Sequence, residues 1–93
     1  MPEPGTPVNA VLGTLVFIRG ANRPFGELTL DDVRMRAAEL KSTVGVGPTT
    51  RVAPIALGWA TLVIEMQRAG AETVRELPAE TVLELRPKLW MTL

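Results

Sequence analysis

Apolar side chains recur at helical spacing in residues 29–41, which carry the clearest amphipathic pattern of the chain. Thr29 and Asp32 have the spacing of a capping box, in which two side chains bond free backbone N–H groups at the start of a helix. The pattern predicts a helix that begins after Thr29 and ends before the turn-rich residues 43–50 (TVGVGPTT). Its apolar stripe consists of Leu30, Val33, Ala37 and Leu40.

A second helix is predicted over about residues 53–69, where almost every side chain is apolar. Pro54 suits the first turn of a helix, and Gly70 is a natural end for it. Because apolar residues lie nearly all round this helix, we expect it to be central in the core. Gly58 weakens a helix, and the usual reason for its presence is the close approach of another helix.

The segment before Gly20 allows two interpretations. Pro7 and an apolar pattern of i, i+3, i+4 spacing favour a helix over residues 7–19. The run VLGTLVFI is also rich in residues that favour strands, so a strand within residues 8–18 stays open as the alternative. A loop is predicted to follow, over residues 19–28.

A short repeat, ETVRELPA and ETVLELRP, fills residues 72–87. Each copy contains Thr-x-x-Glu, the spacing of a capping box, so two short helices are predicted. Pro78 and Pro87 are expected to end them, because the residue before a proline is disfavoured in a helix.

These elements predict an all-α fold, a compact bundle of four to five helices around the helix at about 53–69. With 93 residues the chain is long enough for one domain. Residues 1–6, rich in proline and glycine, are predicted to form a flexible tail, and residues 7–93 a single helical domain.

The composition argues against catalysis. The chain has no His, Cys or Tyr, and therefore lacks the usual general base near neutral pH, soft metal ligands and thiol nucleophiles. No phosphate-loop, dinucleotide or metal-ligand spacing is found, so we expect no enzyme, cofactor or metal. The longest uncharged apolar run, residues 52–64, is too short to cross a membrane, and the acidic start differs from a secretory signal. The predicted location is the cytoplasm.

The remaining class is an interaction module. Hydrophobic residues make up 46% of the chain, more than a domain this small is expected to bury completely. We therefore expect a protein partner or self-association, as in a small bacterial adaptor or regulatory subunit. A tryptophan near the end of the sequence and a phenylalanine in a predicted loop are candidate anchors. The expected contact residues are Phe25, Leu89, Trp90 and Met91.

An alternative function comes from the sequence GVGP at residues 45–48, between two predicted helices. This motif resembles the hairpin of helix-hairpin-helix proteins, which bind the DNA backbone without sequence preference. The resemblance covers residues 40–54 and implies a phosphate bound by backbone N–H groups and one arginine. The same glycines also fit a helix cap followed by a turn, and a net charge of zero argues against a nucleic-acid partner. The implied phosphate-binding residues are Gly45, Val46, Gly47 and Arg51.

Overall fold

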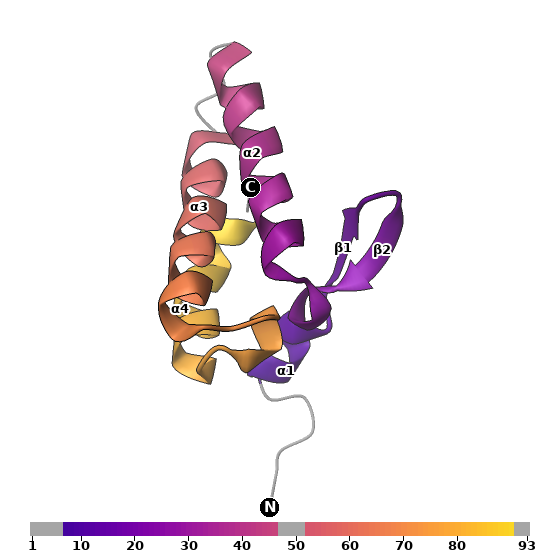
Figure 1. The fold of residues 1–93 in the computed structure, drawn as a ribbon, viewed down its shortest axis with the longest axis vertical. Coiled ribbons are helices and arrows are strands. Elements are labelled where there is room, and N and C mark those ends of the chain that lie inside the picture. Colours follow the sequence, from indigo (N-terminus) through magenta and orange to yellow (C-terminus); the bar gives the residue numbers. More distant parts are fainter. Residues whose placement is uncertain (1–6, 47–51, 91–93) are drawn as a thin grey trace, which may run out of the picture.

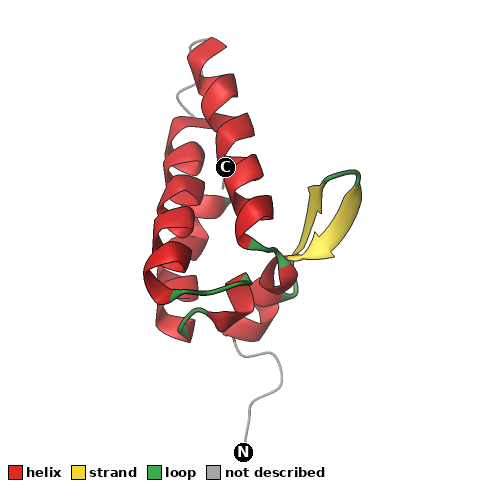
Figure 2. Ribbon diagram, viewed as in Figure 1, coloured by secondary structure: helices red, strands yellow, loops and turns green. Residues whose placement is uncertain are grey.

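Four α-helices and one β-hairpin form the part of the chain that the computed structural model describes, residues 7–46 and 52–90 (Figures 1 and 2). In chain order the elements are α1 (Pro7–Leu12), β1 (Leu15–Ile18), β2 (Ala21–Pro24), the 3-10 turn η1 (Phe25–Glu27), α2 (Leu30–Val46), α3 (Val52–Ala69), the 3-10 turn η2 (Val74–Glu76) and α4 (Ala79–Leu89). The all-α prediction is confirmed in part: the described fold is mostly helical, and the hairpin is the main correction. The predicted tail, residues 1–6, lies outside the described residues.

The hairpin replaces the second half of the helix predicted over residues 7–19. Only α1 is helical there, and β1 pairs antiparallel with β2 so that Ile18 faces Ala21 across a two-residue turn. The turn residues Arg19 and Gly20 have φ values of 55° and 81°. A two-residue turn with positive φ at both positions matches the twist of paired strands. The strand alternative was therefore right for residues 15–18, and the predicted loop 19–28 contains β2 and η1.

The capping box at the start of α2 is confirmed. The Thr29 N–H donates to Asp32 Oδ2 at 3.1 Å, and the Asp32 N–H donates to Thr29 Oγ1 at 3.2 Å. The predicted end of this helix was too early, since α2 continues to Val46. Thr, Val and Gly are less favourable in a helix than Ala by about 1 kcal/mol or less each, whereas an interior proline costs about 3 kcal/mol. Residues 43–46 can therefore continue the helix.

Helix α3 packs against both α2 and α4 (Figure 1), and the core extends from there to buried residues of α1, β1 and the two 3-10 turns. The predicted span of α3 is confirmed to within one residue, but the helix is not buried all round, because Leu57 and Ile64 are 69% and 50% exposed. Gly58 lies directly against the Lys88 backbone of α4, as the sequence predicted for a close helix contact. The most deeply buried side chains are Phe25, Leu28, Val33, Trp59, Leu62, Met66, Val74, Val82 and Leu89.

The repeat near the end of the sequence forms one 3-10 turn and one helix rather than two similar helices. Pro78 is the N-cap of α4, but Pro87 lies inside this helix instead of ending it. A proline in the last turn removes only one helical N–H, so the chain continues to Leu89. Thr81, expected to cap the second helix, lies within α4.

Candidate interaction surfaces

Three aromatic rings from distant parts of the sequence meet in the core. Phe25 lies 5.8 Å from Trp59 and 5.2 Å from Trp90, and the two tryptophans are 6.4 Å apart, all in edge-to-face geometry. The Trp59 indole N–H donates to the Leu89 carbonyl at 3.1 Å, and the Arg36 guanidinium lies over the Trp59 ring. Edge-to-face aromatic pairs stabilise a fold by more than the burial of their apolar surface alone contributes.

Two of the four residues predicted to contact a partner, Phe25 and Trp90, belong to this aromatic cluster. Phe25 is fully buried and Leu89 is 2% exposed, so both belong to the core and offer no free surface in this conformation. Trp90 is partly buried, with one side against the core. Met91 lies outside the described residues. Of the predicted set, Trp90 is thus the described side chain with surface available to a partner.

A more exposed apolar surface, which the sequence pattern did not predict, lies on the hairpin. Leu15 and Phe17 are 61% and 64% exposed, while Val16 and Ile18 between and beside them are buried. Figure 1 shows that the hairpin stands out from the helical body. We call the face that carries Leu15 and Phe17 the hairpin face. The helix predicted for this segment would have buried Leu15, and only the two-residue turn at Arg19 and Gly20 signalled a hairpin.

The outer edge of β1 also carries free backbone groups. In an antiparallel ladder, hydrogen-bonded and non-hydrogen-bonded residue pairs alternate. The pair of Ile18 and Ala21 closes the two-residue turn and is hydrogen-bonded, so the next pair, Phe17 and Asn22, is not. The Phe25 N–H bonds the Thr14 carbonyl at 2.7 Å, which continues this alternation. The N–H and C=O groups of Leu15 and Phe17 therefore point away from β2. No other described element bonds them.

The outer edge of β2 differs, because Pro24 interrupts it. Asn22 and Pro24 occupy the pairs whose backbone groups point outward on this strand. Proline has no N–H, and a proline on an edge strand is a common means of blocking further strand pairing. Of the two edges, β1 is therefore the one suited to accept another strand.

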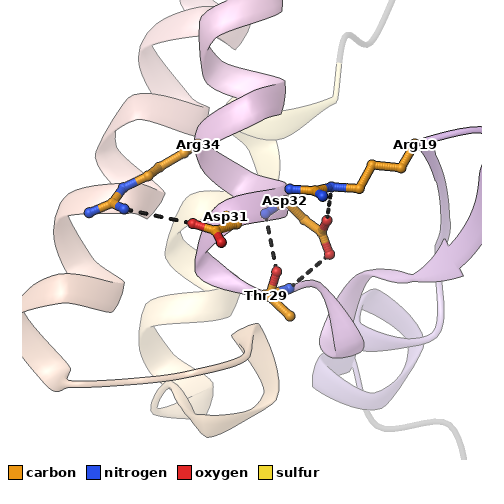
Figure 3. A network of polar contacts seen from close by, with 5 residues as sticks. All are labelled: Arg19, Thr29, Asp31, Asp32 and Arg34. Atoms are coloured by element: carbon orange, nitrogen blue, oxygen red, sulfur yellow. Dashed lines mark hydrogen bonds and ion pairs between the residues drawn. The ribbon is translucent and has the colours of Figure 1, made fainter.

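The hairpin is fixed to the helical body at its turn. The Arg19 Nε lies 2.9 Å from Asp32 Oδ1, and this carboxylate is the same one that caps α2 (Figure 3). The Asp32 side chain is 5% exposed and the Arg19 side chain 44% exposed, so the ion pair is partly shielded from water. The neighbouring pair of Arg34 and Asp31 is longer, 3.8 Å, and much more exposed. The hairpin face is thus presented by a strand with a defined orientation.

The implied phosphate site receives no support from the two residues that the structure describes. Gly45 and Val46 belong to the last turn of α2, where a backbone N–H bonds a carbonyl four residues earlier. Gly47 and Arg51 lie outside the described residues. DNA binding by this motif remains a hypothesis from the sequence.

Metal-binding clusters and membrane-spanning helices are both absent from the described residues. Within residues 7–46 and 52–90, no cluster of three or more Asp, Glu, His or Cys side chains is arranged to hold a metal ion. None of the described helices is long and apolar enough to cross a membrane. Comparison of the chain with protein-family models, curated proteins and solved structures finds no match.

Proposed function

We propose that this chain is a non-enzymatic protein-interaction module, an adaptor or regulatory subunit, that self-associates through the hairpin face and the outer edge of β1. The observation that carries the proposal is the exposure of Leu15 and Phe17, 61% and 64%, on a strand whose edge has free backbone groups. A cytoplasmic location remains a prediction from the cysteine-free composition.

Two copies can pair symmetrically along β1. If Val16 faces its own counterpart, Leu15 of each copy lies opposite Phe17 of the other. In this register the outward N–H and C=O groups of Leu15 and Phe17 form four hydrogen bonds across a two-fold axis. Leucine and phenylalanine then form two cross-strand apolar pairs on the hairpin face. The result is a four-stranded sheet with the two Pro24-bearing strands at its edges.

The expected affinity is low. Burial of a whole Leu or Phe side chain is worth about 1.5–3 kcal/mol, so the exposed part of each contributes at most about 1–2 kcal/mol. Four such side chains and four hydrogen bonds at about 1 kcal/mol each face an association cost of about 4–15 kcal/mol. The gain is at most about 12 kcal/mol, so an association cost of about 7 kcal/mol, in the lower half of that range, leaves about 5 kcal/mol, which corresponds to a dissociation constant on the order of 0.1–1 mM. At concentrations well below this constant the chain is therefore expected to be mostly monomeric, in exchange with a minor dimer.

The test is sedimentation velocity over a concentration series from about 10 μM to about 1 mM, a range that brackets this affinity. The wild-type chain should show reversible dimerisation. The double variant Leu15→Thr, Phe17→Thr keeps strand propensity but removes the apolar contact, and should stay monomeric. Leu57→Gln, which changes an equally exposed leucine on α3, serves as the matched control and should dimerise as the wild type does. A wild-type chain that remains monomeric throughout, or a double variant that dimerises normally, would overturn the proposal.

A further inference from the structure

A groove lies between α1 and α4, and neither Leu15 nor Phe17 is among its described lining residues. It consists of two adjoining hollows of about 300 and 360 Å³ that share Val11, Thr14 and Arg86. Pro87 and Trp90 complete the first hollow, and Pro7 and Ala10 complete the second. Most of the described lining side chains are apolar, while polar atoms make up about half of the exposed lining surface. A volume near 300 Å³ is at the lower end of the range for small-molecule sites.

Among the lining residues that the structure describes, Arg86 is the one with a charged side chain. No carboxylate among the described residues forms an ion pair with it. The Thr14 hydroxyl donates to the Ala10 carbonyl at 3.1 Å, so its proton is already in use. The guanidinium therefore supplies the hydrogen-bond donors in this groove, and they are free to bind an anion.

The apolar walls are held in place by the fold. Trp90 contacts Phe25 edge to face, with ring centroids 5.2 Å apart, so its ring cannot turn without loss of a core contact. Pro87 presents its ring at the end of α4 and has no N–H to offer a ligand. An exposed cation without a described ion-pair partner, beside the apolar side chains of Val11, Pro87 and Trp90, suits a ligand with a single negative group and an apolar chain.

We propose that this groove binds a small apolar monocarboxylate, such as a medium-chain fatty acid. A planar carboxylate accepts two parallel hydrogen bonds from a guanidinium, which favours Arg86 as its partner. The hydrocarbon chain would lie along Val11, Pro87 and Trp90. A phosphate, with its higher charge, would find only one cationic group among the described lining residues. The proposal does not depend on self-association, since the hairpin residues Leu15 and Phe17 do not line the groove.

The experiment is a titration of the full chain with octanoate, followed by NMR of the two indole N–H groups. The chain has two tryptophans, so the two signals can be assigned with one Trp variant. The Trp90 signal should shift and saturate, with a dissociation constant on the order of 1 mM for a ligand of this size. The Trp59 signal should shift less, because Trp59 is buried and bonded to the Leu89 carbonyl. Octanol and acetate separate the contributions of the charge and the chain, and each should bind at least tenfold more weakly than octanoate.

Two variants complete the test. Arg86→Gln should weaken octanoate binding at least tenfold, whereas Lys88→Gln removes an exposed charge from the same helix and should leave binding unchanged. The thermal midpoint of each variant shows that it is folded. The proposal fails if octanol binds as tightly as octanoate, if Arg86→Gln binds as the wild type does, or if the Trp90 signal does not saturate. Loss of dimerisation in the hairpin variant has no bearing on these outcomes.

Discussion

The contact between α3 and α4 makes Gly58→Ala a demanding test of the packing. A Cβ atom at position 58 would lie 2.7 Å from the Lys88 carbonyl carbon and 2.8 Å from the Lys88 Cβ, with the carbonyl oxygen closer still. Carbon atoms in contact are normally about 3.5–4.0 Å apart, so α4 would have to move by roughly 1 Å. The obstacle is backbone, which cannot turn aside as the end of a side chain can.

Two opposing effects determine how much Gly58→Ala changes the free energy of unfolding. Alanine is a better helix former than glycine by about 1 kcal/mol, which favours the variant. Overpacking in a core costs about 1–3 kcal/mol, and a displaced backbone places this case at the upper end. Movement of α4 would also stretch the 3.1 Å hydrogen bond from Trp59 to the Leu89 carbonyl. We expect a net loss of about 2 kcal/mol, which lowers the midpoint of thermal unfolding by roughly 10 °C in a domain of this size.

The measurement is urea unfolding followed by tryptophan fluorescence, with Gly13→Ala as the matched control. A Cβ at Gly13 meets the Asn9 carbonyl oxygen at 3.4 Å, an ordinary contact. The control should therefore be as stable as the wild type or slightly more stable. If Gly58→Ala equals or exceeds the wild type in stability, helix propensity outweighs the contact, and the close approach of α4 to α3 is refuted.

Two other substitutions test the cap and the aromatic cluster by chemical denaturation. Asp32→Ala removes the cap of α2 and the ion pair to the hairpin, and should lower the free energy of unfolding by about 1–2 kcal/mol. Asp31→Ala should lower it by less than about 0.5 kcal/mol, because the pair of Asp31 with Arg34 is exposed. If Asp32→Ala costs as little as Asp31→Ala, the cap and its ion pair do not stabilise the fold. Trp59→Phe leaves the carbonyl at the end of α4 without its donor and should cost about 2–3 kcal/mol. Trp90→Phe, at a partly buried ring, should cost clearly less, and the reverse order would contradict the assigned burial.

Local signals predicted the start of α2 and the span of α3. The capping pair Thr29 and Asp32 and the stripe that follows were confirmed because the first turn of a helix is set by residues three or four positions apart. The close approach at Gly58 could be predicted for a similar reason, since a glycine lowers helix propensity and is tolerated within an apolar helix mainly where a neighbouring backbone needs the space.

The hairpin and the burial of the aromatic residues could not be predicted in this way. The run VLGTLVFI satisfies both helical and strand patterns, so its structure is decided by the turn after it and by packing. Phe25 has the neighbours of a loop residue, yet its N–H bonds Thr14 and its ring enters the core, both through contacts distant in sequence. Leu15 and Phe17 are exposed because this segment forms a hairpin instead of a helix. The hairpin face was therefore absent from the predicted contact residues.

The aromatic cluster also has a consequence for the order of folding. Phe25, Trp59 and Trp90 come from three widely separated parts of the sequence, so their contacts close long loops. The pairing of α2 with α3 joins neighbouring helices and closes a much shorter loop. Contacts of low sequence separation form earlier in small domains, so this helix pair is expected to precede the cluster. The two tryptophans should therefore reach their native fluorescence only in the last step, when α4 docks.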